Sequence, residues 1–247
     1  GAEATKNAVL SKVGPGGFKK SLRHDNFMPD YAVVDPELTL TCPRAVTAAC
    51  GMDAFTQLLE AYVSTAGNPM TDALAFGGLE MIASNLELVC GAGADDIEAR
   101  GGMSYAALMS GVALANAGLG AVHGLAGPLG GLFKIPHGAA CGAIMAPAVA
   151  LTVDALLDSD PGNPALAKFA RVGALFADGS TRVDVQTGCA RLVEKIYSLT
   201  ESLGIPRLGE FGVAASDLDG IVAASDSKYN PVKLSPEQLK SVLEKSL

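Results

Sequence analysis

The chain has 247 residues, a length typical of one large domain or two small ones; 49% of them are hydrophobic, 5% are aromatic and none is tryptophan. A core of small aliphatic side chains lets helices approach closely, so the composition favours helical packing over an aromatic-rich β sandwich. The net charge is −8 without a basic run, no apolar window reaches the roughly 18 residues of a membrane span, and no export signal opens the chain, so neither nucleic acid nor a membrane is expected as a partner.

Residues 1–42 carry short β-type runs separated by glycine, proline and polar breaks. The runs are NAVLS, FKKSL, YAVVD and LTLTC, at residues 7–11, 18–22, 31–35 and 38–42. The basic charge around FKKSL predicts an exposed hairpin or edge strand, and His24 is expected on the solvated surface beside it. A few short strands cannot form a stable sheet alone, so residues 1–42 are interpreted as the remnant of another domain's sheet.

From residue 43 onward the apolar residues recur at helical spacing, which predicts about eight helices. The expected helices cover residues 44–64, 72–90, 96–127, 137–157, 165–177, 187–204, 214–224 and 236–245. The Gly- and Pro-rich stretch 128–136 is expected to be a connector, and Pro147 is expected to kink its helix. No repeat or long linker divides residues 43–247, which therefore form one helical domain.

The cysteines are five in number, scattered, and contain no C-x-x-C pair: Cys42, Cys50, Cys90, Cys141 and Cys189. An odd, scattered set does not indicate a disulfide framework. Buried free thiols in a reducing cytoplasm are therefore expected for all five.

Two of the three histidines, His123 and His137, lie fourteen positions apart (137 − 123) in a Gly-rich, charge-poor stretch. Imidazole is the commonest neutral metal ligand, although two ordinary histidines, one on a helix and one capping a loop, explain this stretch equally well. Asp53 and Gln57, at i and i+4 of one expected helix, point at the same spot. Together the four side chains could converge on one divalent cation in a catalytic site, whereas Asp53 alone is better explained as a cap or an ion-pair partner.

Four segments, in this order, resemble the iron-containing (group III) alcohol dehydrogenase family. They are DPELTLTCPRAVTAACGMDA at 35–54, GMDAFTQLLEAY at 51–62, AVHGLAGPLGGLFKIPHG at 121–138 and DSKYNPVKLSPEQL at 226–239. The resemblance implies an all-helical, dehydroquinate synthase-like C-terminal domain over residues 43–247, with residues 1–42 left from a dinucleotide-binding α/β domain. The dehydroquinate synthase and glycerol dehydrogenase relatives fit these segments less well.

This resemblance also implies a chemistry: NAD or NADP takes hydride from a primary alcohol or diol, giving the aldehyde, while Fe²⁺ or Zn²⁺ polarises the alcohol oxygen. Asp53, His123 and His137 fall on three of the family's metal-ligand positions, and Gln57 occupies the fourth, where members commonly carry histidine. Residues AEATKNAVL resemble a segment that lies against the cofactor in the family. By that match, Glu3 and Thr5 are cofactor-binding residues.

Two departures from the family pattern bear on activity. Gln57 replaces a ligand histidine, and Gly127 stands where members often carry a histidine thought to help in proton relay or substrate positioning. The catalytic residue is therefore left open among Tyr105, a water and the cofactor ribose. These losses favour an alternative function, a catalytically inactive member of the fold that serves as a dimerisation or binding module.

The expected partners follow from the resemblance and from the missing cofactor domain. They are a small alcohol or aldehyde substrate and further copies of the chain, as a homodimer or higher homo-oligomer. No Gly-rich βαβ fingerprint is present, so the chain by itself is expected not to bind NAD(P) properly and to be inactive.

Overall fold

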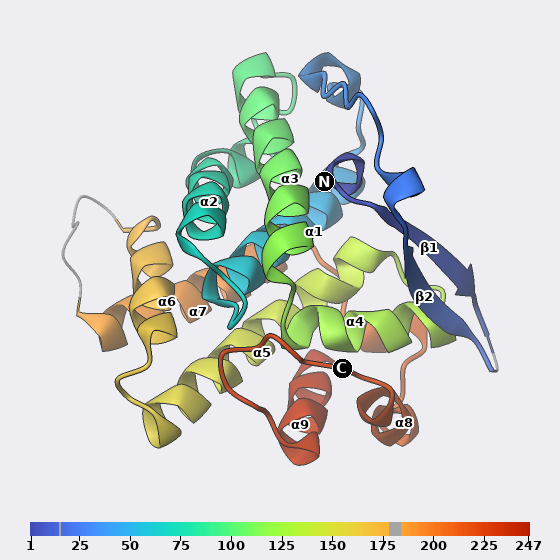
Figure 1. The fold of residues 1–247 in the computed structure, drawn as a ribbon, viewed down its shortest axis with the longest axis vertical. Helices are drawn as coiled ribbons and strands as arrows, with labels where there is room; N and C mark the ends of the chain where they lie inside the picture. The colour runs from blue at the N-terminus through green and yellow to red at the C-terminus, as the bar shows by residue number, and fades with distance from the viewer. Residues whose placement is uncertain (15, 178–183) are drawn as a thin grey trace.

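The structure, a computed structural model, describes residues 1–14, 16–177 and 184–247 and is mainly helical (Figure 1). Its helices are α1 (Arg44–Val63), α2 (Pro69–Val89), α3 (Ile97–Ala117), α4 (Ala121–Leu132), α5 (His137–Ser159), α6 (Pro164–Ala174), α7 (Val185–Ser202), α8 (Leu218–Ala223) and α9 (Pro236–Ser246). Its strands are β1 (Asn7–Lys12) and β2 (Phe18–Arg23), and short 3-10 helices cover Ala2–Ala4, Asp25–Phe27, Pro36–Thr39, Leu208–Phe211 and Ala215–Asp217. The predicted mainly α class is confirmed.

Helix α1 lies at the centre of the helical body, in contact with α2, α3 and α5. Met52, Phe55 and Leu58 are fully buried on it, and a helix with apolar side chains on most sides is one that other helices surround. At its start the guanidinium of Arg44 donates hydrogen bonds to the carbonyls of Cys90, Leu203 and Ser202. Arg44 therefore ties α1 to the carboxyl ends of α2 and α7.

The start of α2 lies three residues before the predicted Asp72, because Asn68 caps the helix. Its side-chain oxygen accepts hydrogen bonds from the backbone N–H groups of Met70 and Thr71, and the Thr71 hydroxyl accepts one from the Asn68 N–H. This capping box satisfies donors that a helix start otherwise leaves free, and Pro69 has no N–H to satisfy at the first position.

The single helix predicted over residues 96–127 is wrong, because α3 ends at Ala117 and α4 turns away by 101°. Gly118 makes this break with a φ of +70°, and the ring of Tyr229 occupies the place where a Cβ would stand. The Ser64 hydroxyl donates to the carbonyl of Ala117, the last residue of α3. The break between α3 and α4 therefore depends on the close approach of Tyr229, a residue far along the chain.

The connector predicted over residues 128–136 is also wrong in its first half, because α4 runs through Pro128 to Leu132. Its inner face buries Leu125 and Leu129, and this burial offsets the hydrogen bond that a proline cannot donate. Gly131 has a second role, since a Cβ there would come within 2.9 Å of the Phe18 carbonyl carbon. The strand β2 can therefore lie directly against α4.

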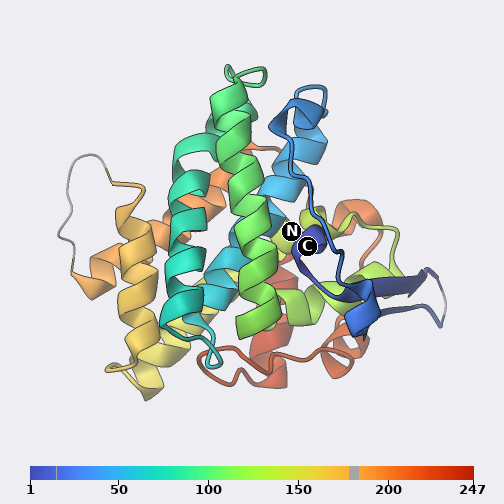
Figure 2. The same ribbon diagram turned by 45° about the horizontal axis from the view of Figure 1, so that its top comes forward.

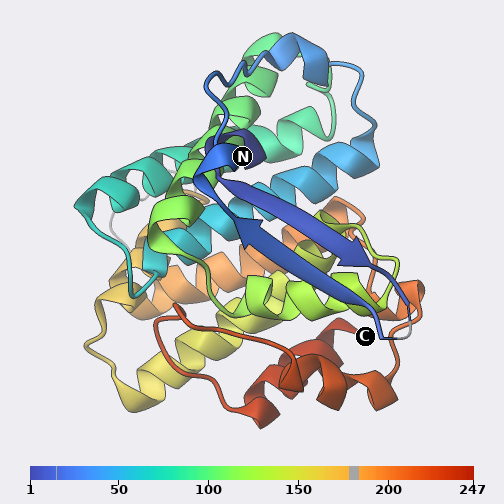
Figure 3. The same ribbon diagram turned by 45° about the vertical axis from the view of Figure 1, so that its right-hand side comes forward.

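The ribbon of β1 and β2 is antiparallel, with Asn7 opposite Arg23 and Lys12 opposite Phe18, and it crosses α4 (Figure 3). These are the first two predicted strands; the glycine break between them includes Pro15, which lies outside the described residues. The predicted strands at 31–35 and 38–42 are wrong. Asp35 instead caps the 3-10 helix Pro36–Thr39 by accepting from the N–H of Glu37. In the part of the chain that the structure describes, neither segment is paired with a strand.

The last third of the chain follows the predicted helices closely. Helices α6 and α7 pack against each other through Gly173 and Gly188, where added Cβ atoms would overlap the facing backbone, and the chain ends in α8 and α9 (Figure 2). Pro147 lies inside α5, which continues to Ser159, and the kink predicted there stays a prediction. By length and composition α5 could cross a membrane, but 72% of its most apolar window is buried in the body, as in a core helix.

All five cysteines are free, as predicted, but two are not buried. Cys50, in the second turn of α1, is exposed, and Cys42, just before that helix, is half-buried; both line a pocket that includes Thr39 of the N-terminal segment. His24 is exposed, as predicted, and its Nδ1 accepts a hydrogen bond from the backbone N–H of Asn26.

Candidate metal centre

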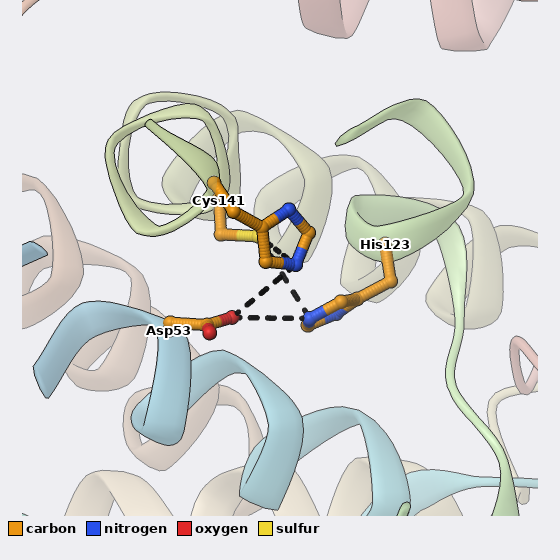
Figure 4. Close-up of side chains that lie close together, drawn as sticks. Asp53, His123 and Cys141 are labelled. Atoms are coloured by element: carbon orange, nitrogen blue, oxygen red, sulfur yellow. Dashed lines mark hydrogen bonds and ion pairs between the residues drawn. The ribbon is translucent and has the colours of Figure 1, made fainter. Parts of the chain in front are cut away.

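Four side chains that can bind a metal come together where α1, α4 and α5 meet (Figure 4). Asp53 lies in the middle of α1 and His123 in the first turn of α4. His137 is the first residue of α5, and Cys141 lies one helical turn further along the same helix. One ligand atom from each residue lies within 4.8 Å of the others, so three helices distant in sequence present a single group of donors.

The spacing of these atoms suits one cation at their centre. Nε2 of His123 lies 3.2 Å and Nε2 of His137 lies 3.8 Å from Oδ1 of Asp53. Sγ of Cys141 lies 3.8 Å from each of the two Nε2 atoms. In a tetrahedral zinc site, bonds of about 2.0–2.3 Å place neighbouring ligand atoms roughly 3.3–3.6 Å apart. The donor set therefore fits a divalent metal with little adjustment.

A close contact between two helices brings His137 to Asp53. Gly138 follows His137 in the first turn of α5, and a Cβ there would overlap the carbonyl oxygen of Ala49 on α1. Because glycine lacks that atom, the start of α5 can press against α1 four residues before Asp53. The glycine next to the histidine thus has a packing role in assembling the group.

Glu60, which sequence reasoning missed, holds His123 from behind. One of its carboxylate oxygens accepts the backbone N–H of Val122 at 2.7 Å, and the other lies 2.7 Å from Nδ1 of His123. Gly120, the N-cap of α4, has no side chain to cap the helix. The Glu60 carboxylate from α1 takes that role, and its negative charge interacts favourably with the positive end of the helix dipole. A carboxylate on Nδ1 also leaves Nε2 directed at Asp53, an arrangement typical of histidines that bind metals.

The protonation states follow from burial and from the neighbouring charges. Burial lowers the pKa of His137 to about 4, so at neutral pH its ring is uncharged, as a ligand's must be. Burial alone would lower the pKa of His123, but the charge of the Cys141 sulfur and hydrogen bonds with Asp53, Cys141 and Glu60 hold that pKa well above its ordinary value. Burial opposes ionisation of Asp53 as well, yet His123 keeps the pKa of this carboxyl below its usual range.

Gln57 lines the same cleft, but its carbonyl oxygen accepts a hydrogen bond from the Ser110 hydroxyl at 2.8 Å. Its predicted role as a metal ligand is therefore not visible in its contacts and stays a prediction. Gly127 also lines the cleft, and a Cβ there would meet open space. The hydroxyl of Tyr105 lies near Gly77 of α2 rather than in the cleft wall, which does not favour this tyrosine as a proton relay.

A cleft of ≈ 800 Å³ opens beside the metal-binding side chains. The ribbon forms one wall, and α1, α4 and the segment before α9 form the others. Thr5 is buried at the edge of this cleft, where its hydroxyl donates to the Ala2 carbonyl at 2.9 Å. Glu3 is not among the residues that line this cleft. The structure thus brings Thr5, but not Glu3, to the cleft.

Two members of the site, Glu60 and Cys141, were not predicted, although each lies at helical spacing from a residue that was. Glu60 is seven positions after Asp53 (60 − 53), and Cys141 is four after His137 (141 − 137). Both spacings put two side chains on one helix face, and a carboxylate flanked by apolar residues, as in LLEAYV, is itself unusual. This helical spacing is the sequence signal from which Glu60 and Cys141 could have been predicted as members of the site.

Known proteins match this chain in sequence and in fold. The sequence model described as "Fe-containing alcohol dehydrogenase family, C-terminal" matches residues 47–247. "Alcohol dehydrogenase 4" of Saccharomyces cerevisiae is 35% identical over 251 aligned positions, covering 99% of this chain. "NAD-dependent methanol dehydrogenase" of Bacillus methanolicus is 32% identical over 221 positions, covering 89% of this chain. A crystal structure of 1,3-propanediol oxidoreductase superposes with a TM-score of 0.86 at 30% identity, covering 98% of this chain.

The matches cover much less of the relatives than of this chain. The chain spans 62% of the yeast protein, 55% of the methanol dehydrogenase and 62% of the crystallised oxidoreductase. Each relative thus contains a large part that has no counterpart in this chain.

Proposed function

The chain belongs to the Fe-containing alcohol dehydrogenase family, and from this membership we propose that it is the metal-binding helical part of an NAD(P)-dependent dehydrogenase. The intact enzyme interconverts a primary alcohol or diol with its aldehyde. The family match over residues 47–247 supports oxidoreduction of this class, and the similar proteins carry names of alcohol and diol dehydrogenases.

The observation that carries the proposal is the convergence of Asp53, His123 and His137 from three helices beside a cleft. These residues would hold Fe²⁺ or Zn²⁺, which supplies a Lewis acid that lowers the pKa of an alcohol oxygen. Asp53 contributes the negative charge that a divalent cation requires. Glu60 orients the ring of His123, and the packing of α5 on α1 places the backbone of His137 beside Asp53.

The nicotinamide cofactor belongs to the proposal as well, with residues 1–42 as the last part of a cofactor domain and residues 43–247 as the metal-binding domain. Thr5 at the cleft edge and the basic side chains Lys19 and Arg23 in the cleft wall support a site for a phosphate-bearing ligand on this side. Glu3 stays a prediction. Residues of the ribbon would then orient the cofactor, and the cleft would hold the alcohol between it and the metal-binding side chains.

The alternative is a catalytically inactive module of the same fold that serves in dimerisation or binding. Two observations favour it: Gln57 is engaged with Ser110, and Gly127 leaves open space where a relay side chain could lie. The apolar side chains exposed on residues 1–42 would suit another domain or a second copy of the chain in a homo-oligomer.

Metal analysis separates these two functions and can be done on the chain itself, because it does not require the cofactor. We expect one equivalent of Fe²⁺ or Zn²⁺ after anaerobic reconstitution and gel filtration. The double variant His123→Ala/His137→Ala should lose it, and His24→Ala, which changes the exposed third histidine, should keep it. If the unaltered chain retains no metal with either ion, the catalytic function is abandoned in favour of the inactive module.

A further inference from the structure

The sulfur of Cys141 occupies the fourth corner of the group formed by Asp53, His123 and His137, and we propose that it is the fourth metal ligand, a thiolate. The centre is then an Asp-His-His-Cys site, which sets this chain apart from a site completed by an amide at position 57. The substrate oxygen would join these four residues as a fifth ligand, as catalytic sites can expand to five ligands. The inference rests on the proposed function, since it concerns the metal that the same residues hold.

The geometry of the sulfur is the first argument. Sγ lies 3.8 Å from Nε2 of both His123 and His137, so it is placed symmetrically between the two imidazoles. A zinc–sulfur bond of about 2.3 Å and zinc–nitrogen bonds of about 2.0–2.1 Å, at tetrahedral angles, put sulfur and nitrogen roughly 3.6 Å apart. A cation placed to bind both imidazoles and Asp53 therefore lies within reach of this sulfur.

The surroundings of the sulfur are the second argument. Cys141 is fully buried, and buried cysteines usually act as small apolar side chains. Here, however, the thiol faces two imidazole nitrogens and a carboxylate oxygen, all within 4.8 Å, instead of aliphatic groups. In Figure 4 the side chains of Cys141, Asp53 and His123 point toward one another. Cys189, buried to a similar degree, offers a contrast because its sulfur donates to the carbonyl of Leu166 and is not part of a group of metal-binding side chains among the described residues.

The contacts of Gln57 are the third argument. Its carbonyl oxygen, the only atom of an amide that binds a hard cation well, accepts a hydrogen bond from Ser110 on α3. The Ser110 hydroxyl, which can also donate to the Ala107 carbonyl at 2.7 Å, gives this oxygen a polar partner on α3, whereas the sulfur of Cys141 has no polar contact outside the group of donors among those the structure describes. Cys141 is therefore the better placed of the two.

Binding converts the thiol to a thiolate, with its proton released to solvent and with no oxidation or reduction. Asp53 and the thiolate then supply two negative charges, which balance the two charges of the cation. Soft thiolate ligands favour zinc over harder ions, so the site should prefer Zn²⁺ to Mg²⁺ or Mn²⁺. A site completed by an amide oxygen would instead favour a harder ion.

Substitution of the bound metal by Co²⁺ tests the proposal, because cobalt–thiolate bonds give an intense charge-transfer absorption in the near ultraviolet that oxygen and nitrogen ligands do not. The chain reconstituted with one equivalent of Co²⁺ should show this band. Cys141→Ser should abolish it, whereas Cys189→Ser and Gln57→Ala should leave it unchanged. We also expect Cys141→Ser to bind Zn²⁺ at least about tenfold more weakly in competition with a chelator.

X-ray absorption at the zinc edge of the unaltered chain gives a second measurement that needs no variant. One sulfur neighbour at about 2.3 Å is expected, together with nitrogen and oxygen neighbours near 2.0–2.1 Å. Bound metal without a sulfur neighbour, or a cobalt band that survives Cys141→Ser, overturns the role of Cys141 and leaves the proposed function standing. Failure to bind any metal overturns both.

Discussion

The helical body, residues 43–247, and the N-terminal segment, residues 1–42, differ most in how far their apolar side chains are covered. In the body Phe55 and Leu58 are fully buried, whereas in the segment Tyr31 is 89% and Val33 88% exposed. Among the described residues of the segment only Thr5 is buried. The helices of the body cover α1 from several sides, but a two-stranded ribbon has one covered face at most, and such ribbons need a further layer to be stable.

The two regions are therefore stabilised by different contacts. The body contains the contacts that hold it together, including those that assemble the metal-binding side chains. The segment relies on α4 beneath the ribbon and, in the proposed enzyme, on the cofactor domain above it. Substitutions matched between the two regions should therefore have very unequal effects.

The largest expected difference comes from truncating a leucine in each region. Leu58→Ala removes a side chain that fills the space against Gly78 of α2, and it should lower the free energy of unfolding by about 3 kcal/mol. The melting temperature should then fall by roughly 6–12 °C. Leu10→Ala, at a side chain 54% exposed, should change the free energy of unfolding by less than about 0.5 kcal/mol. Thermal unfolding followed by circular dichroism measures both, and equal shifts would mean that the ribbon is as much a part of the core as α1.

A second prediction sharpens the comparison inside the body, where glycines differ in what surrounds them. Gly138→Ala places a methyl group on the carbonyl of Ala49 and should destabilise the chain by about 2 kcal/mol as α5 is pushed from α1. Gly101→Ala, also inside a helix but with open space around it, should stabilise by about 0.5–1 kcal/mol. Chemical denaturation with a two-state fit compares the pair. A stabilising effect at both positions would show that α1 and α5 are far enough apart at Gly138 to accommodate a methyl group.

The same two regions differ in how well the sequence predicts them. In the body, apolar periodicity and burial coincide, so α1, α5, α6 and α7 were predicted within a few residues of their ends. In the segment, YAVVD has strand-forming residues but no strand beside it, so no ladder forms and the prediction is wrong. The break at Gly118 depends on Tyr229, over a hundred positions later (229 − 118), and local pattern does not report such a contact.

The candidate site shows the same limit at the level of single residues. The structure brings Asp53, His123 and His137 together. Residue type and the family resemblance both singled them out, and their role as metal ligands stays a prediction. Glu60 and Cys141 were missed because an acid and a thiol on apolar helices have many possible partners, and only the packing of α1, α4 and α5 selects among them. The sequence did not reveal the contact of Gln57 with Ser110 on α3, and the role of Gln57 as a metal ligand stays a prediction.

The most specific effect on the site comes from replacing a carboxylate by an amide in each region. Glu60→Gln puts an NH₂ group where a carboxylate oxygen now meets Nδ1 of His123. To accept from that group, the ring must move its proton from Nδ1 to Nε2, the nitrogen that faces Asp53. A protonated Nε2 has no lone pair for a metal, so metal affinity should fall at least about tenfold. Competition with a chelating dye measures this loss.

Asp25→Asn is the matched control, since Asp25 forms an ion pair with Lys6 at 2.7 Å on the exposed ribbon. Exposed pairs of this kind contribute little because water and salt screen them, so neither the melting temperature nor metal affinity should change measurably. The two carboxylates make equally short contacts, and only the buried one, between a helix start and a metal-binding ring, is expected to matter. If Glu60→Gln binds metal as tightly as the unaltered chain, Glu60 does not orient His123 for metal binding. Its buried carboxylate then serves only to cap α4.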